Sequence, residues 1–197
     1  MSAAVRHDFQ AIAEWIKPGS RVLDLGCGDG ALLAYLEEGR QINGYGVEIS
    51  SEGVLASAKR GINVLQMNLE DGLSIFETAS FDYVILSRTL QAMHNTEGIL
   101  QEMLRVGRQG IVTFPNFGYW RNRLQVLAGR MPVSEEIPYQ WFDTPNIHLC
   151  TLNDFEELCE EVGARVLQRV VMANGKDIQM LPNLLGSLAV YRFEKEA

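Results

Sequence analysis

The sequence has only three cysteines, which argues against a disulfide-stabilised protein and against a zinc-binding protein. Cys27, Cys150 and Cys159 are odd in number and show neither a CxxC pair nor a Cys/His ligand spacing. A disulfide framework or a zinc site is therefore not expected, and free thiols are typical of a reducing compartment. We expect no bound metal.

Positive charge and long apolar runs are also scarce. The 17 Lys and Arg residues are outnumbered by 25 Asp and Glu residues, which gives a net charge of −8. Because no broad basic surface can form, we expect neither nucleic acid nor a membrane as a partner, and the arginines at 121, 123 and 130 favour a solvated face or a protein contact. No apolar run approaches the roughly 18 residues of a membrane helix, and the first residues lack a signal pattern, so the expected location is cytoplasmic.

What the chain does contain is a regular alternation of strand-like and helix-like patterns. Val5, Phe9, Ile12 and Ile16 recur at helical spacing, which predicts a first helix that ends before Pro18. Near-continuous apolar strands with helical crossovers indicate an α/β fold with a mostly parallel sheet covered on both faces. The predicted strands are Val22–Leu25, Tyr45–Ile49, Val64–Met67, Tyr83–Leu86 and Ile111–Phe114, and the predicted helices between them are Ala31–Glu38, Val54–Arg60 and Ile99–Val106.

The alternation breaks between residues 115 and 150, which carry four prolines and one short helical stretch near Trp120–Leu127. It then resumes with a helix that Asn153 is expected to cap and with final strands at Val166–Met172 and Leu188–Phe193. We therefore expect residues 1–197 to form a single domain. Residues 115–150 are expected to form a cap over the sheet edge where open α/β sheets bind ligands.

A glycine-rich turn follows the first strand of the sheet. Asp24, Gly26, Gly28 and Gly30 alternate there, and glycines allow a tight turn and a close backbone approach to a ligand. The same glycines also fit a dinucleotide fingerprint. A pyrophosphate would meet the like charge of Asp24, however, whereas the ammonium group of an aminoacyl ligand would meet an acceptor. The turn carries no side chain that binds phosphate.

A second acid follows at the end of the next strand. Glu48 lies 20 residues after Gly28, where an acid can hydrogen-bond ribose hydroxyls. Together the two acids and the glycines describe a nucleoside with an amino-acid tail and no phosphates, which fits S-adenosylmethionine. An NAD-dependent oxidoreductase is disfavoured by Asp24 and by the lack of a plausible hydride-transfer site.

Within residues 15–114 the segments VLDLGCGDG, YGVEIS, VLQMNLEDG and FDYVILSRTLQAM resemble class I S-adenosylmethionine-dependent methyltransferases. The resemblance implies a Rossmann-like fold whose mostly parallel seven-stranded sheet ends in an antiparallel hairpin. It also implies that S-adenosylmethionine or S-adenosylhomocysteine is the cofactor. The implied cofactor-binding residues are Asp24, Gly26 and Gly28 at the methionine end, Gly30 in the same turn, Glu48 at the ribose, Asn68 and Leu69 at the adenine, and Ser87 near the ligand. Asn68 departs from the family pattern, which often has an acid there.

No catalytic residue can be assigned from the sequence. The Asn-Pro-Pro-Tyr motif of amino-methylating enzymes is absent, as is a Pro-Cys nucleophile. Polar groups expected near the cleft are His94, Asn116, Tyr139, Asp143 and His148, and each also fits a purely structural role.

Longer segments are more specific. IAEWIKPGSRVLDLGCGDG, EMLRVGRQGIVTFPNFGYWRNRLQ and GRMPVSEEIPYQWFDTPNIHLCTLNDFEELC resemble the methionine-biosynthesis family MetW. The resemblance implies a protein that works beside homoserine O-acyltransferase in making methionine. Two hypotheses follow: a non-catalytic partner tuned by S-adenosylmethionine, or an active methyltransferase of an unknown small acceptor that binds under residues 115–150. The missing catalytic motif favours the first, with residues 117–142 as the candidate contact surface.

Overall fold

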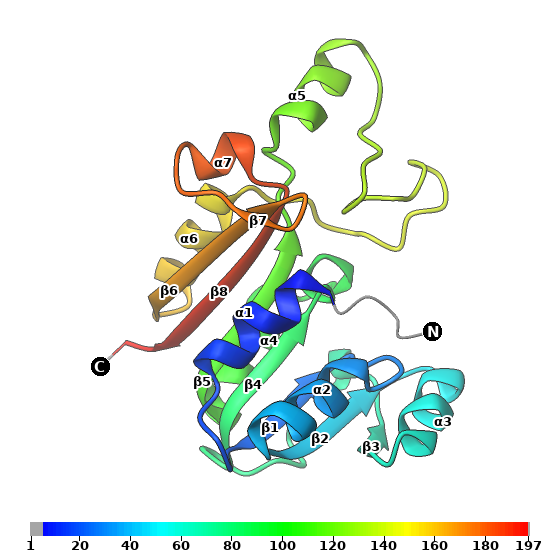
Figure 1. Ribbon diagram of the computed structural model, residues 1–197, viewed down its shortest axis with the longest axis vertical. Helices are drawn as coiled ribbons and strands as arrows, with labels where there is room; N and C mark the ends of the chain where they lie inside the picture. Colours follow the sequence, from blue (N-terminus) through cyan, green and yellow to red (C-terminus); the bar gives the residue numbers. More distant parts are fainter. Residues whose placement is uncertain (1–5, 197) are drawn as a thin grey trace.

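A computed structural model describes residues 6–196 of the chain. Within that range one eight-stranded sheet runs in the order β3-β2-β1-β4-β5-β8-β6-β7 (Figure 1). The first five strands are parallel, and β8 runs antiparallel to both β5 and β6. The strands are β1 Arg21–Leu25, β2 Asn43–Glu48, β3 Asn63–Gln66, β4 Phe81–Ser87, β5 Gly107–Pro115, β6 Ala164–Ala173, β7 Lys176–Asp177 and β8 Leu188–Lys195.

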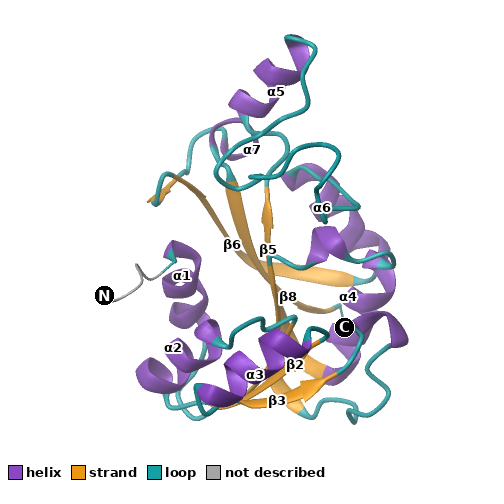
Figure 2. Ribbon diagram, turned by 90° about the vertical axis from the view of Figure 1, so that its right-hand side faces the viewer, coloured by secondary structure: helices purple, strands orange, loops and turns teal. Residues whose placement is uncertain are grey.

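Helices cover both faces of this sheet, as Figure 2 shows. The helices of the described chain are α1 His7–Trp15, α2 Ala31–Arg40, α3 Ser51–Lys59, α4 Thr96–Val106, α5 Trp120–Leu127, α6 Leu152–Glu161 and α7 Pro182–Leu185, of which α5 does not cover the sheet. Side chains alternate between the faces along each strand, so Val22 packs with α1 and α2, whereas Leu23 packs in the cluster that contains α4 and α6. Two apolar cores result, one on each side of the sheet.

The predicted fold class is confirmed, and every predicted strand is present. The sheet has eight strands rather than seven because the two-residue β7 pairs with the end of β6. The predicted first helix is confirmed as α1, although Val5 lies outside the described residues. Across residues 6–196, none of the helices combines the length and the apolar character that crossing a bilayer requires.

The helix after the irregular stretch is confirmed, but the prediction of its capping residue was wrong. Thr151 rather than Asn153 caps α6: its hydroxyl accepts from the Asp154 backbone N–H, and the Asp154 carboxylate accepts from the Thr151 N–H. This reciprocal pair satisfies two backbone donors at the helix start. Asn153 lies one residue inside α6 and is exposed.

Residues 115–150 leave the sheet at the carboxyl end of β5 and contain α5 as their only regular element, α5 projecting away from the sheet in Figure 1. The buried Asn116 amide anchors the start of this segment, because it donates to the carbonyl oxygens of Asn183 and Gly186. Further along, the backbone N–H groups of Ile147 and His148 donate to the Gln91 carbonyl oxygen. The segment is therefore held against the turn that follows β4.

Candidate functional site

The glycine turn connects β1 to α2, and its backbone excludes larger residues at two positions. Gly26 has φ +73°, and a Cβ there would lie 2.7 Å from the Thr89 hydroxyl oxygen. Gly30 has φ +74°, and a Cβ there would lie 2.9 Å from the Ser57 hydroxyl oxygen. Left-handed backbone and close neighbours together require glycine at both positions. The backbone of the glycine turn therefore lies close to Thr89, which follows the carboxyl end of β4.

Glu48 lies beneath this turn at the end of β2. One carboxylate oxygen accepts a 2.9 Å hydrogen bond from the Gly28 N–H, and the other accepts one of 2.8 Å from the Ser50 N–H. The side chain is 9% exposed. Each carboxylate oxygen can accept a second hydrogen bond, so a role toward ribose hydroxyls stays open to this residue. The same carboxylate also fixes the conformation of the turn.

Asp24 lies one residue before the end of β1, in an environment that disfavours its charge. The residue is 2% exposed, and its Oδ1 has no hydrogen-bond partner among the described residues. Burial raises the pKa of Asp24 to about 7, with a smaller upward effect from the Glu48 charge and a downward effect from the Arg6 guanidinium. A buried acceptor without a partner is costly. A ligand ammonium group would supply both the missing donor and the compensating charge, so the site fits the aminoacyl end of S-adenosylmethionine.

A cavity of about 530 Å³ opens beside the turn, between α1 and α2. Three of the predicted site residues line it, namely Asp24, Gly26 and Ser87, and Arg6 closes the side formed by the start of α1. We call this space the turn cavity. Its other lining residues are Phe9, Cys27, Asp29, Ala31, Leu32, Ala34, Tyr35, Glu38 and Arg60.

The two predicted adenine contacts lie elsewhere. Asn68 caps a short 3-10 helix, η1 (Leu69–Asp71), by accepting a hydrogen bond from the Glu70 N–H. Leu69 is buried and lines a separate cavity of about 130 Å³ that is also bordered by Met93. The structure does not bring either residue into the turn cavity, so their adenine role remains a prediction.

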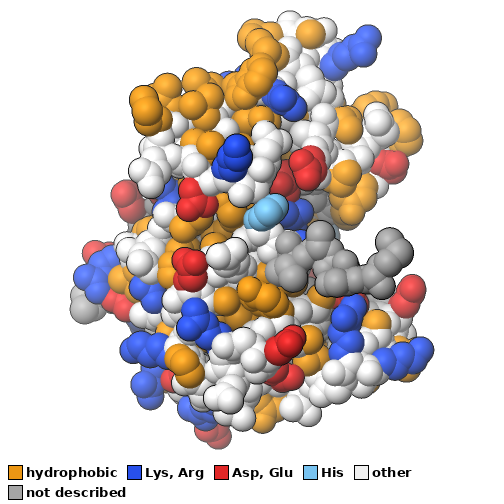
Figure 3. Space-filling model, viewed as in Figure 1, with side chains coloured by type: hydrophobic (Ala, Val, Ile, Leu, Met, Phe, Trp, Pro, Cys, Tyr) orange, Lys and Arg blue, Asp and Glu red, His pale blue; other side chains and the backbone are white. Residues whose placement is uncertain are grey.

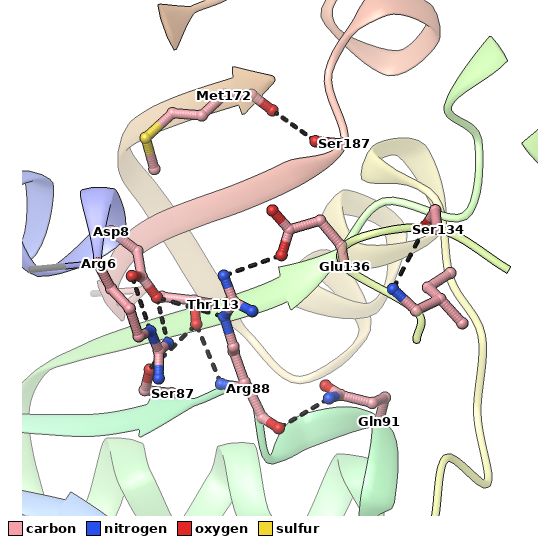
Figure 4. Close-up of polar contacts among 11 residues, drawn as sticks. Arg6, Asp8, Ser87, Arg88, Gln91, Thr113, Ser134, Glu136, Met172 and Ser187 are labelled. Atoms are coloured by element: carbon pink, nitrogen blue, oxygen red, sulfur yellow. Dashed lines mark hydrogen bonds and ion pairs between the residues drawn. The ribbon is translucent and has the colours of Figure 1, made fainter. Parts of the chain in front are cut away.

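An ion-pair network next to the turn cavity was not predicted from the sequence. Arg6 and Arg88 both pair with the fully buried carboxylate of Asp8, and Arg88 also lies 2.8 Å from Glu136 (Figure 4). Arg88 directly follows β4 with φ +56°. These residues join α1, the turn after β4 and the 115–150 segment. Residues so distant in the chain produce no periodic pattern in the sequence. The only neighbouring residue predicted to belong to the site was Ser87, which directly precedes Arg88.

The network borders a second cavity of about 300 Å³, which we call the network cavity. It is lined by Arg6, His7, Arg88 and Glu136, and by residues of β6, β8 and the turn between β6 and β7. Burial raises the pKa of Glu136, and the Arg88 guanidinium opposes that shift. Because Arg6 lines both spaces, the two cavities are neighbours.

The polar groups considered for catalysis line neither cavity. Asn116 is committed to backbone carbonyls, and the His148 ring lies 3.3 Å from the His94 carbonyl oxygen. Tyr139 and Asp143 are exposed on the 115–150 segment. Their positions therefore favour structural or surface roles for all of them.

The architecture is the Rossmann-like fold of class I S-adenosylmethionine-dependent methyltransferases. An S-adenosylmethionine-dependent methyltransferase from Archaeoglobus fulgidus is similar with a TM-score of 0.72 and 15% sequence identity, over 95% of this chain and 91% of that one. The [4+2]-cyclase SpnF is similar with a TM-score of 0.70 and 17% identity, over 96% of this chain and 80% of that one. At such identities the likeness shows the fold alone.

Sequence comparison places the chain more closely. Residues 6–193 match the family described as methionine biosynthesis protein MetW, and the chain belongs to that family. A curated relative from Rhodopirellula baltica, the bifunctional methionine biosynthesis protein MetXA/MetW, is 40% identical over 203 residues. The match covers 96% of this chain, which spans only about a third (33%) of the relative's length. The resemblance drawn from the sequence is thereby confirmed.

Proposed function

We propose that this chain is an S-adenosylmethionine-binding partner of homoserine O-acyltransferase in methionine biosynthesis. The observation that carries the proposal is the fused relative, in which a MetW part and a MetXA part share one polypeptide. Fusion keeps two proteins at high effective concentration, which is useful when they act together. We infer that the MetXA part corresponds to the acyltransferase that the family resemblance implies.

The ligand assignment rests on the two acids at the glycine turn. Among the described residues Asp24 has a buried oxygen without a partner, which suits an ammonium group, and Glu48 binds the Gly28 N–H at the same turn, with acceptor capacity left for ribose hydroxyls. The turn cavity, at about 530 Å³, falls within the size range of small-ligand sites. In this role S-adenosylmethionine, or S-adenosylhomocysteine, reports the state of methionine metabolism to the acyltransferase.

The contact surface that we propose is the apolar face of residues 120–149. Leu127 is 82% exposed, Trp141 72% and Phe142 70%, and hydrophobic side chains gather over α5 and the neighbouring loop in Figure 3. Large exposed aromatic side chains, such as the adjoining Trp141 and Phe142, are typical of binding hot spots. Arginines on α5 add local positive charge to an acidic chain.

The test is an acyltransferase assay with and without this chain, combined with co-purification of the two proteins. We expect a complex and an increase in acyltransferase activity. A double variant, Trp141→Ser with Phe142→Ser, should abolish both while the chain stays folded. Leu55→Ser is the matched control, because Leu55 is also exposed (56%) but lies on α3. Absence of a complex together with unchanged activity contradicts the proposal.

A second candidate function, methyl transfer to a small acceptor, is favoured by the network cavity. Its volume of about 300 Å³ suits a small molecule, and it adjoins the turn cavity through Arg6. Incubating the chain with S-adenosylmethionine and pools of small metabolites should then produce S-adenosylhomocysteine. No product above the rate of spontaneous breakdown would leave only the binding role.

A further inference from the structure

Arg6 lines the turn cavity together with Asp24, and no role has yet been assigned to it. It directly precedes α1, its guanidinium lines the cavity, and its Nη2 donates to the Ser87 hydroxyl at 3.2 Å. Its charge acts on Asp24, since it is the main influence that lowers the pKa of that buried acid. The partly exposed Arg6 cation and the buried Asp24 oxygen, which has no partner among residues 6–196, therefore line the same cavity.

The Arg6 guanidinium is held in place by the Asp8 carboxylate. Its Nε donates to Asp8 at 3.1 Å, and its Nη2 also contacts that carboxylate. Asp8 is fully buried and also forms an ion pair with Arg88. Its carboxylate therefore keeps a cationic partner when Arg6 is replaced. The Arg6 side chain remains 40% exposed. An arginine has five N–H donors in a planar fork; among the described residues Asp8 and Ser87 take those on Nε and Nη2, which leaves the two on Nη1 for a carboxylate.

We propose that Arg6 binds the α-carboxylate of the ligand's amino-acid end, while Asp24 takes its α-ammonium group. This inference rests on the proposed binding of S-adenosylmethionine and adds the residue that recognises the acid half of its zwitterion. Arginine suits this role because Nη1 carries the guanidinium charge and can donate a charge-assisted hydrogen bond to the carboxylate while Nε and Nη2 stay on Asp8 and Ser87. The site then selects a nucleoside with an intact amino-acid tail over one that has lost its carboxylate.

One other arginine lines the turn cavity and provides a matched control. Arg60 lies just after α3, where its guanidinium pairs with Asp29 at 2.5 Å and both side chains are about half exposed. It is not among the charges that shift the pKa of Asp24. Arg60→Gln and Arg6→Gln each remove one positive charge from the lining of the cavity. Only Arg6→Gln removes the charge that acts on Asp24.

The experiment is isothermal titration of the purified chain with S-adenosylmethionine and with decarboxylated S-adenosylmethionine. We expect the wild-type chain to prefer the carboxylate form by ~10- to 100-fold, the scale of a charge-assisted hydrogen-bond pair. Arg6→Gln should remove this preference, because it weakens binding of the carboxylate form more than binding of the decarboxylated ligand; the latter also changes, since Arg6 acts on the pKa of Asp24. Arg60→Gln should keep the preference. Because the chain has a net charge of −8, its overall field favours the more cationic decarboxylated ligand, so net charge cannot produce the expected order.

The alternative outcomes separate this inference from the one it rests on. If the wild-type chain binds neither ligand, the proposed cofactor is wrong and the role of Arg6 falls with it. If it binds both equally, or if Arg6→Gln weakens both by the same factor, the cofactor stands but Arg6 does not recognise the carboxylate. Loss of preference in Arg60→Gln instead would transfer the role to Arg60. Arg6→Lys, which keeps the charge, should retain part of the preference and serves if Arg6→Gln fails to fold.

Discussion

The carboxylate of Glu48 accepts a 2.9 Å hydrogen bond from the backbone N–H of Gly28, 20 residues earlier in the chain. The acid at the end of β2 therefore has two tasks: it shapes the glycine turn, and we propose that it binds the ribose. Any substitution of Glu48 acts on both, and a useful experiment has to separate them.

Glu48→Gln should weaken binding of S-adenosylmethionine, because an amide removes the charge that strengthens hydrogen bonds from ribose hydroxyls. We expect a loss of ~10-fold or more, measured by calorimetry. An analogue with a 2′-deoxyribose distinguishes the two tasks. If Glu48 contacts the hydroxyls, the wild-type chain discriminates against the analogue and Glu48→Gln does so less. Equal weakening of both ligands would mean that Glu48 only shapes the turn.

Binding should also depend on pH through Asp24. Its pKa of about 7 means that this carboxyl is largely protonated in the free chain below neutral pH. A ligand ammonium group favours the carboxylate, so binding at pH 6 should release a proton. Affinity should rise from pH 5.5 toward 7.5, and titrations in two buffers of different ionisation enthalpy measure the released proton. Asp24→Asn should bind weakly with no such dependence, and a pH-independent affinity of the wild-type chain would contradict the role of Asp24.

The same pKa affects folding with a definite sign. The folded chain holds the Asp24 proton up to about pH 7, whereas the ordinary value is 3.8. Between about pH 4 and pH 7 the folded chain therefore binds a proton at Asp24 that the unfolded chain does not. The free energy of unfolding contributed by this proton is fully present below about pH 4 and is lost as the pH rises to about 7. Chemical unfolding between pH 5 and 7.5 should show a steeper fall for the wild-type chain than for Asp24→Asn. Parallel curves would contradict the raised pKa.

The capping box of α6 gives a prediction about stability alone. Thr151→Ala should lower the free energy of unfolding by ~1 kcal/mol, because the Asp154 N–H at the start of the helix loses its hydroxyl acceptor. Asn153→Ala is the control and should change it by less than ~0.5 kcal/mol, as expected for an exposed residue. Equal effects in denaturant unfolding would show that the cap has been assigned to the wrong residue.

The ion pair between Arg88 and Glu136 should restrain the 115–150 segment. Glu136→Gln removes the charge that faces the Arg88 guanidinium at 2.8 Å, while Arg88 keeps its second partner, Asp8. We expect faster amide hydrogen exchange in residues 131–149 with little change in the sheet. Glu135→Gln is the neighbouring control, since Glu135 lines the same cavity but has no ion pair with Arg88. Identical exchange in both variants would show that the ion pair does not hold the segment.

Local patterns in the sequence predicted the sheet and part of the site. The strand that carries Asp24 near its end and the acid 20 residues after Gly28 follow from apolar runs and fixed spacing, and the structure places both acids at the glycine turn. The position of the Asn68 side chain could not be predicted in this way. An asparagine that can contact an adenine can also cap a following helical turn, and Asn68 caps one here. Spacing alone does not separate these two uses.

Other features depend on contacts that no local pattern encodes. Asp8 pairs with Arg88, and Arg88 with Glu136, across three segments that only the folded chain brings together. The choice between Thr151 and Asn153 as helix cap depends on backbone angles, since both residue types cap helices well. The two-residue strand Lys176–Asp177 is too short to show an alternating pattern.

Titration of the chain with S-adenosylmethionine, S-adenosylhomocysteine and NAD, followed by calorimetry and thermal unfolding, tests the central claim most directly. We predict one binding site per chain for the two adenosyl ligands and none for NAD. At a ligand concentration 100 times the dissociation constant, the fold should gain about 2.7 kcal/mol of stability. Binding of NAD in place of S-adenosylmethionine, or no shift with either adenosyl ligand, would contradict the account.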